Sequence, residues 1–277
     1  MSYVQTTNLP PSADQPTAGP AMIEVRGLGV AFQTRDNPHP ILAGVDLTVR
    51  PTEFLSIVGS SGTGKTTLLR CIAGLQRPTT GQITVDGVPV TGPPSNLALI
   101  FQDYGRSLFP WLRVLSNVTL PLRANRELSA TQRREVAMSA LDAVGLADAA
   151  QQYPWQLSGG MQQRTAIARA LAFQPEVLLM DEPFASVDAQ TRSDLEDLVL
   201  GIRQRYPLTL VMVTHDVDES VYMADRVAVL GGHPAHVTTL LPVDLPTPRD
   251  QLTTKSLPEF IALRAEVLKS VRTREEV

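Results

Sequence analysis

Hydrophobic and polar residues follow two patterns along the chain. From Met22, the stretch MIEVRGLGVAF and the alternating segment VDLTV predict strands with one buried face, and the inward positions of the second are Val45, Leu47 and Val49. Short continuous apolar runs follow as FLSIV, VLLMD, LTLVMVTH and RVAVL, with helical stretches between them. Because buried strands alternate with helices, we expect an α/β fold with a mostly parallel core and an antiparallel element near the N-terminus.

A helical insert is predicted between the core strands, at roughly residues 103–163. Ser129 is the expected N-cap of one helix, with Gln132 three residues later, and Gly145 stands where that helix would end. Apolar residues recur at helical spacing between these signals, namely Val136, Ala140, Leu141 and Val144.

The two ends of the chain differ in composition from the centre. Residues 1–21 are rich in Pro, Thr, Ser and Gln and have no apolar periodicity, so a disordered segment is expected there. Beyond Gly231 the chain is predicted to be loop-like, with Pro242, Pro246 and Pro248, before a short charged helix near residues 258–273. We therefore divide the sequence into a main domain over residues 22–240 and a short C-terminal extension over residues 241–277.

Composition is typical of a protein that folds in water. Of the 277 residues, 43% are hydrophobic and 19% are charged, which is sufficient for a full core. The net charge of −4 provides no basic surface for nucleic acid, so no nucleic-acid partner is expected. Cys71 is the single cysteine, which excludes disulfides within the chain. No run of about 18 apolar residues and no signal-peptide pattern occur, so we predict a cytoplasmic protein.

The strongest chemical signal is the stretch GSSGTGKTT, which matches G-x-x-x-x-G-K-[ST] between the apolar FLSIV and the helical LLRCIAGL. Glycines in such a loop let backbone N–H groups surround phosphates, and the following helix adds its dipole. Lys65 is placed to reach the β- and γ-phosphates, and Thr66 to bind Mg²⁺. A simple Gly/Ser-rich turn is the competing interpretation, and the order strand, loop, helix disfavours it.

A second signal is a pair of acids at the end of an apolar run, Asp181 and Glu182 in EVLLMDEP. An acid at the carboxyl end of a strand can reach a metal at the phosphate loop, and its neighbour can orient or deprotonate water. Taken alone, the pair could equally be a solvated acidic turn. Its pairing with the phosphate loop favours the functional interpretation.

Several further residues are ambiguous when each is considered by itself. Gln102 in LIFQD and His215 in VMVTHD each end an apolar run, where an ordinary polar strand end is as plausible as a site residue. Asp216 is the expected cap of the helix after His215. Phe32 is more often a core residue than a base-stacking platform. Ser158, Gly159 and Gly160 in QLSGGMQQR open a helix, which is either a plain capped start or a second anion site.

Taken in order, these features resemble the ATP-binding cassette (ABC) ATPases. The phosphate loop, FQ, LSGGMQQR, LLMDEP, ASVD and THD occur in the order and approximate spacing of that family, from Met22 to about residue 232. The resemblance implies a P-loop NTPase core with an antiparallel β subdomain and an inserted helical subdomain, and it implies hydrolysis of ATP with Mg²⁺. The stretches FQDYGRSLFPWLRVLSNV and YPWQLSGGMQQR are most similar to importers of nitrate, sulfonates, taurine and related solutes.

The resemblance also assigns roles to individual residues. Glu182 is implied as the general base, His215 as the switch histidine at the γ-phosphate, and Gln102 as a lid residue near Mg²⁺ and water. Metal contacts are implied for Thr66, Gln102 and Asp181. Contacts to ATP are implied for Phe32, Gly59, Ser60, Ser61, Gly62, Thr63, Gly64, Lys65, Thr66 and Thr67, and for Ser158, Gly159, Gly160 and Gln162 acting on the ATP of a partner subunit.

Partners follow from the same resemblance. In this family two cassettes pack head to tail, so a homodimer is implied, and integral membrane permease subunits dock beside the lid glutamine. The apolar run Leu108, Phe109, Pro110, Trp111 and Leu112 is interpreted as that docking surface, with core packing as the alternative. A solute-binding protein is an indirect partner, and the expected location is the inner face of the cell membrane.

One loop departs from the family pattern, because Ala185, Ser186, Val187 and Asp188 stand where S-A-L-D is usual. The aspartate is present, whereas Ala185 has no hydroxyl for the hydrogen bonds that the first serine of the family pattern could make. The main functional alternative is a soluble ABC-type ATPase that is not coupled to transport. Long heptads or a basic surface would favour that alternative, and the sequence has neither.

Overall fold

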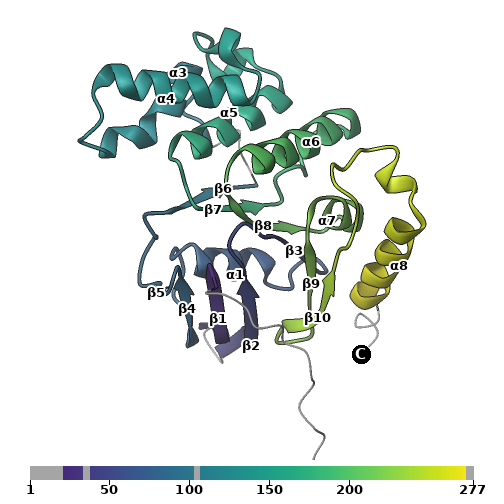
Figure 1. Cartoon of the computed structure of the whole chain (residues 1–277). Coiled ribbons are helices and arrows are strands. Elements are labelled where there is room, and N and C mark those ends of the chain that lie inside the picture. Colours follow the sequence, from purple (N-terminus) through teal and green to yellow (C-terminus); the bar gives the residue numbers. More distant parts are fainter. Residues whose placement is uncertain (1–20, 34–37, 103–106, 273–277) are drawn as a thin grey trace, which may run out of the picture.

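The computed structural model describes residues 21–33, 38–102 and 107–272. Two β-sheets and two groups of helices make up this part of the chain (Figure 1). The expected disordered segment up to residue 20, and residues 103–106 at the predicted start of the helical insert, lie outside the described residues. Within the described ranges, no helix combines the length and apolar character needed to cross a bilayer.

The smaller sheet is antiparallel and comes from the N-terminal part of the chain, as predicted. Its strand order is β2-β1-β4-β5. Val45, Leu47 and Val49 are buried on one face of β2, as their alternation with polar residues predicts. The bounds are Ile23–Gln33 for β1, Pro38–Val49 for β2, Thr80–Val85 for β4 and Val88–Pro89 for β5.

The larger sheet has the order β10-β9-β3-β8-β7-β6, and all its pairings except β10 with β9 are parallel. Every residue of β3, β7 and β8 is buried, which explains their continuous apolar runs. The bounds are Leu97–Ile100 for β6, Phe54–Val58 for β3, Val177–Asp181 for β7, Thr209–Thr214 for β8, Arg226–Gly231 for β9 and His236–Pro242 for β10.

The prediction of a loop beyond Gly231 is wrong for β10. This strand pairs antiparallel with β9 and occupies the edge of the larger sheet. Its residues are half-buried or exposed, so they lack the apolar run of the central strands, and Pro242 lies at its last position, where a proline is compatible with an edge strand. The helix predicted near residues 258–273 is confirmed as α8, Pro258–Arg272.

Four helices lie close to the larger sheet: α1 (Lys65–Ile72), α6 (Ala189–Arg205), α7 (Val217–Met223) and α8. The phosphate loop follows β3, Glu182 follows β7 and His215 follows β8. Because these three strands are parallel neighbours, their carboxyl ends meet at one edge of the sheet. Residues far apart in the sequence are thereby brought to one site.

The helical insert forms a separate group that Figure 1 shows at one end of the larger sheet. Ser129 and Gln132 form the predicted capping box at the start of α4, and Gly145 follows the end of that helix with φ 70°. The last helix, α5, extends to Ala172 and therefore continues toward β7. The bounds are Val114–Thr119 for α3, Leu120–Ala124 for η1, Ala130–Ala143 for α4, Ala147–Ala149 for η2, Pro154–Gln156 for η3 and Gly159–Ala172 for α5.

Candidate nucleotide site

The phosphate loop depends on glycine at three positions. Gly62 and Gly64 have φ of 82° and 91°, a left-handed conformation that side chains disfavour. At Gly59, an added Cβ would lie 2.4 Å from the carbonyl oxygen of Leu230. A Cβ on Gly62 would meet no atom within 4 Å, so this glycine faces open space. The loop therefore presents bare backbone at the start of α1, as a phosphate site requires.

Lys65 is the first residue of α1 and is 6% exposed. Its Nζ donates hydrogen bonds to the carbonyl oxygens of Gly59, at 2.7 Å, and Ser60, at 2.9 Å. Burial lowers the pKa of Lys65, while the nearby charges of Glu182 and Asp181 oppose that shift. A buried ammonium held by neutral carbonyls would gain from an anion in the loop, so this residue fits a bound phosphate.

Thr66 and Asp181 form the second part of the site. The Thr66 hydroxyl donates to Oδ1 of Asp181 at 2.9 Å, and Asp181 is 5% exposed. Burial raises the pKa of Asp181, and the Glu182 charge adds to this effect against the Thr66 hydrogen bond. A divalent cation would offset the cost of burying this carboxylate.

The donors present fit Mg²⁺, which takes oxygen ligands and usually completes its shell with phosphates and water. The Thr66 hydroxyl and the Asp181 carboxylate are oxygen ligands of this kind. Within the described residues, no cluster of three or more His, Cys, Asp or Glu side chains could form an all-protein metal cage.

Glu182 is the point at which three elements meet. Its Oε2 accepts a hydrogen bond from Nε2 of Gln102 at 3.1 Å and lies 3.2 Å from Nδ1 of His215. Its backbone N–H donates to the carbonyl of Val213 in β8 at 2.9 Å, and its φ of 44° is left-handed. Gln102 and His215 therefore both contact one carboxylate oxygen of Glu182, and the three residues predicted as catalytic lie together beside the phosphate loop.

Phe32 lies on β1 and is 47% exposed, so the alternative of a core residue is wrong. Its partner in the β1–β2 pairing is His39. His39 lines a cavity of about 360 Å³ together with Gly62 and Thr63 of the phosphate loop. The exposed ring therefore belongs to a strand pair whose end reaches the loop.

The signature residues open α5. Ser158 is its N-cap, and the Ser158 hydroxyl accepts from the Met161 N–H at 3.3 Å. A Cβ on Gly160 would lie 2.5 Å from a methyl carbon of Thr191 in α6, so only glycine fits there without a shift. The side-chain NH₂ group of Gln162 donates to the carbonyls of Pro154 and Leu157, so this donor is already paired within its own subunit.

Asp188 caps α6 in the loop that departs from the family pattern. Its carboxylate accepts from the Thr191 N–H at 3.0 Å and from the Thr191 hydroxyl at 2.7 Å. These bonds lower the pKa of Asp188. The Ala185 N–H donates to the carbonyl of Glu182 at 3.3 Å. The cap therefore forms without a serine hydroxyl at position 185.

The interpretation of residues 108–112 as one docking surface is wrong for Leu108, which is 2% exposed, whereas Trp111 is 70% exposed. Phe109 and Trp111 pack edge to face with ring centroids 5.4 Å apart. Asn117 is fully buried and bonds the N–H and carbonyl of Phe109 and the carbonyl of Leu112. Sequence reasoning missed this residue, although an asparagine inside the apolar stretch VLSNVTL was a signal.

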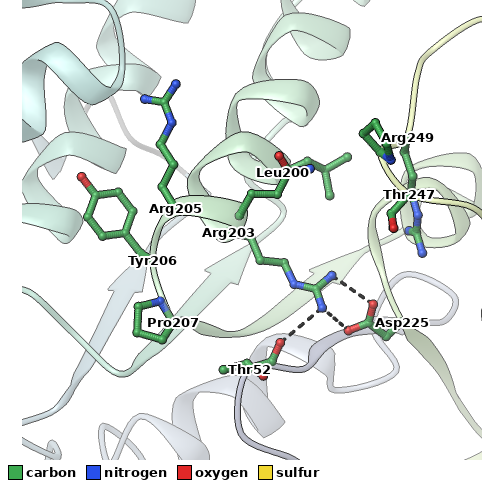
Figure 2. Close-up of a pocket in the computed structure, with 11 residues that line it drawn as sticks. Thr52, Leu200, Arg203, Arg205, Tyr206, Pro207, Asp225, Thr247 and Arg249 are labelled. Carbon is green, nitrogen blue, oxygen red and sulfur yellow. Dashed lines mark hydrogen bonds and ion pairs between the residues drawn. The ribbon is translucent and has the colours of Figure 1, made fainter.

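A large cavity lies elsewhere in the molecule. It has a volume of about 750 Å³ and includes Thr52, just before β3, and Asp225, just before β9 (Figure 2). Arg203 of α6 makes two hydrogen bonds to Asp225 and one to the carbonyl of Thr52. This cavity is at the amino ends of the parallel strands, opposite the phosphate loop, so it is separate from the candidate nucleotide site.

The fold and the site define a class. A glycine loop with Lys65 and Thr66 follows one parallel strand, and at the same edge of the sheet Asp181 ends β7 and Glu182 comes directly after it. This arrangement is that of a P-loop protein that binds nucleoside triphosphate.

Comparison with known proteins narrows the class to a family. The sequence profile of the ABC transporter family matches residues 42–185. The nitrate import ATP-binding protein NrtD of Synechocystis is 42% identical over 258 residues, which cover 91% of this chain and 96% of that protein. The aliphatic sulfonates import ATP-binding protein SsuB of Bacillus licheniformis is 43% identical over 235 residues, covering 85% and 88% of the two chains.

Similarity to solved structures supports the same family. A dimeric structure of a post-hydrolysis state of the ATP-binding cassette MJ0796, bound to ADP and Pi, has a TM-score of 0.71 and 30% identity. The match covers 80% of this chain and 99% of that one. The chain belongs to the ABC transporter family as an ATP-binding subunit, and it is an ATPase.

Proposed function

We propose that this subunit powers import of a small anionic or organic solute of the nitrate and sulfonate type. The observation that carries the proposed chemistry is the single Glu182 oxygen shared by Gln102 and His215 beside the phosphate loop. One carboxylate is thereby oriented from two sides, as a group that aligns a water molecule must be.

Each remaining site residue has a role in the proposed reaction. Lys65 and the loop N–H groups hold the β- and γ-phosphates, and Phe32 stacks on the base. Glu182 accepts the proton of the attacking water, and His215 contacts the γ-phosphate. Thr66, Asp181 and Gln102 would hold Mg²⁺, which supplies positive charge that offsets the charge of the phosphates.

The functional unit in this proposal is a head-to-tail homodimer. Ser158, Gly159 and Gly160 open α5 with a hydroxyl, N–H groups and a helix dipole, a combination that suits the ATP held by the partner subunit. Gln162 joins that contact when its present bonds to Pro154 and Leu157 are exchanged. The dimeric structure of MJ0796 supports this arrangement by similarity.

Coupling to transport requires a membrane partner. We place integral permease subunits on the exposed ring of Trp111, with a solute-binding protein on the other side of the membrane. The subunit then works at the inner face of the cell membrane. The similarity to nitrate and sulfonate import proteins supports the solute class.

The chemistry is tested by Glu182→Gln. The variant should bind ATP as the parent does, lose at least about 100-fold in turnover, and accumulate as an ATP-bound dimer in size-exclusion chromatography. Glu135→Gln, an exposed carboxylate on α4, is the matched control and should keep full activity. Normal turnover in Glu182→Gln would remove this residue from the role.

Transport is tested by expressing the subunit with the permease genes of its source and assaying solute uptake. ATPase activity that needs no permease, together with no recovery of the subunit in a membrane complex, would favour a soluble ABC-type ATPase instead.

A further inference from the structure

A network of charged side chains, of which Glu219 is buried and Arg192 and Asp216 are partly exposed, lies beside the backbone of His215. Glu219 of α7 is 4% exposed, and its Oε2 accepts a hydrogen bond from the Thr214 hydroxyl at 2.6 Å. The same hydroxyl oxygen accepts from the Asp216 N–H at 3.0 Å. Thr214 and Asp216 are the two neighbours of His215 in the chain. Glu219 therefore fixes the backbone on both sides of the histidine.

Arg192 connects this network to α6. Its Nη1 lies 3.1 Å from Oδ2 of Asp216, and its Nε lies 3.5 Å from Oε1 of Glu219. Arg192 is four residues beyond Asp188, the N-cap of α6, so it lies one turn into that helix. One guanidinium thus joins the helix that starts at Asp188 to the helix that starts after His215.

Among the described groups, Arg192 is the cation that pairs with Glu219. Glu196 of α6 is 2% exposed and adds a like charge, but Lys255 and Gln251 of the C-terminal extension bond its carboxylate at 3.2 and 3.0 Å. Burial raises the pKa of Glu219 to about 7, with Asp216 and Glu196 adding to the shift and Arg192 opposing it.

The far end of α7 is also fixed. Arg249 donates to the carbonyl of Tyr222 at 2.6 Å, in the last turn of the helix. Figure 2 shows Arg249 on the segment that borders the large cavity. Because Arg249 holds the last turn of α7, a displacement at the Arg192 contact would move the start of this helix, beside His215.

We infer that Glu219 and Arg192 are positioning residues for ATP hydrolysis, which hold His215 at the Glu182 carboxylate and tie it to the helix that follows Asp188. This inference rests on the proposed role of His215. The His215 side chain is 61% exposed, so few of its own contacts restrain it. Its position is therefore set by the backbone that Glu219 and Arg192 anchor.

The competing interpretation is an ion-pair network that stabilises the fold and has no effect on the reaction. A purely structural network would change the melting temperature and leave the turnover of the folded protein unaltered. A positioning network would lower kcat with little change in KM for ATP, because neither residue touches the nucleotide.

The experiment compares Arg192→Gln, Arg192→Lys and Glu219→Gln, each assayed well below its melting temperature. We expect kcat to fall about tenfold in Arg192→Gln and Glu219→Gln, with KM and the nucleotide Kd within about twofold of the parent, since small misplacements of reacting groups are costly. Arg192→Lys keeps a cation and should recover about half of the lost activity. Arg264→Gln breaks an exposed ion pair with Asp218 on α7 and is the matched control, with parental kcat.

Three outcomes would overturn the inference: an unchanged kcat, no recovery by Arg192→Lys, or a loss that disappears when the assay is cooled. Arg192 is partly exposed, so its variants decide the matter if Glu219→Gln does not fold. His215→Ala separates this inference from the proposed function. Full activity in His215→Ala would remove the role of the histidine itself, whereas an inactive His215→Ala with a normal Arg192→Gln would reject only the positioning network.

Discussion

The exposed ring of Trp111 yields the sharpest prediction about coupling, which concerns Trp111→Ala. The residue is 70% exposed, so the isolated subunit does little to bury it. If a permease covers this ring, the substitution should leave the ATP site and the fold almost intact and weaken the membrane complex. If the ring mainly supports the loop around Asn117, the fold should suffer instead.

The magnitude on the isolated subunit follows from the exposure. A fully enclosed aromatic side chain buries about 150–250 Å², so roughly a third of that is about 50–80 Å², which contributes about 1–2 kcal/mol at about 25 cal/mol per Å². For a domain of this size each kcal/mol changes the melting temperature by about 2–4 °C, which gives a fall of about 2–8 °C. A buried tryptophan would lose about 3–5 kcal/mol.

The expected effect of Trp111→Ala on the affinity for the permease is larger than its effect on the stability of the isolated subunit. Truncation of an aromatic anchor at an interface commonly costs about 2 kcal/mol or more, a roughly thirtyfold loss of affinity. The measurement is therefore paired: the melting temperature of the purified subunit, and its recovery with the permease together with solute uptake.

Leu252→Ala is the matched control, because Leu252 is 80% exposed and lies in the C-terminal extension. It should change neither quantity. A fall in melting temperature above about 10 °C in Trp111→Ala, or normal recovery with the permease, would refute the docking interpretation.

Two further predictions concern the nucleotide site, and a third concerns the buried Glu219 of α7. Lys65→Ala should weaken ATP binding at least about tenfold in a titration, because the buried ammonium in the phosphate loop is lost; unchanged affinity would show that the loop backbone suffices. Mixing Lys65→Ala with Ser158→Arg subunits should recover part of the ATPase activity that both homodimers lack, since one of the two shared sites is then intact; verified heterodimers without activity would contradict this. Glu219→Gln should remove a pH dependence of stability: the folded-state pKa of Glu219 is raised from 4.5 to about 7, so the folded parent binds the proton more tightly and its unfolding free energy falls as pH rises through that window. If the urea midpoint changed by the same amount between pH 5 and pH 8 in the parent and in Glu219→Gln, this prediction would be rejected.

Much of the core was predictable because its signals are local. The runs that become β3, β7 and β8 are buried on both faces, and Ser129 with Gln132 forms a cap within four residues. β10 was missed because an edge strand needs no apolar run and its partner lies outside the segment. The same limit applies to Leu108 and Trp111, since adjacent apolar residues differ in exposure only once the loop around Asn117 is known.

The candidate site was predictable as a set of residues but not as a geometry. Motif order identified Glu182, Gln102 and His215, whereas their shared oxygen depends on three separate segments. The pairing of Arg192 with Glu219 joins two helices across 27 residues of sequence, and each residue alone looks like an ordinary helical charge. Long-range ion pairs of this kind have no local pattern.

The left-handed backbone at Glu182 sets stability against activity at a single position. A non-glycine residue at φ 44° is disfavoured, and such strain costs on the order of 1 kcal/mol or more. Glycine or asparagine would adopt this conformation more easily. A selection for thermostability alone would therefore enrich chains that have exchanged the proposed catalytic carboxylate for a residue better suited to the turn. Engineering of a more thermostable cassette should keep Glu182 and place stabilising substitutions elsewhere, because a substitution that relieves the strain at position 182 would also abolish the ATPase activity.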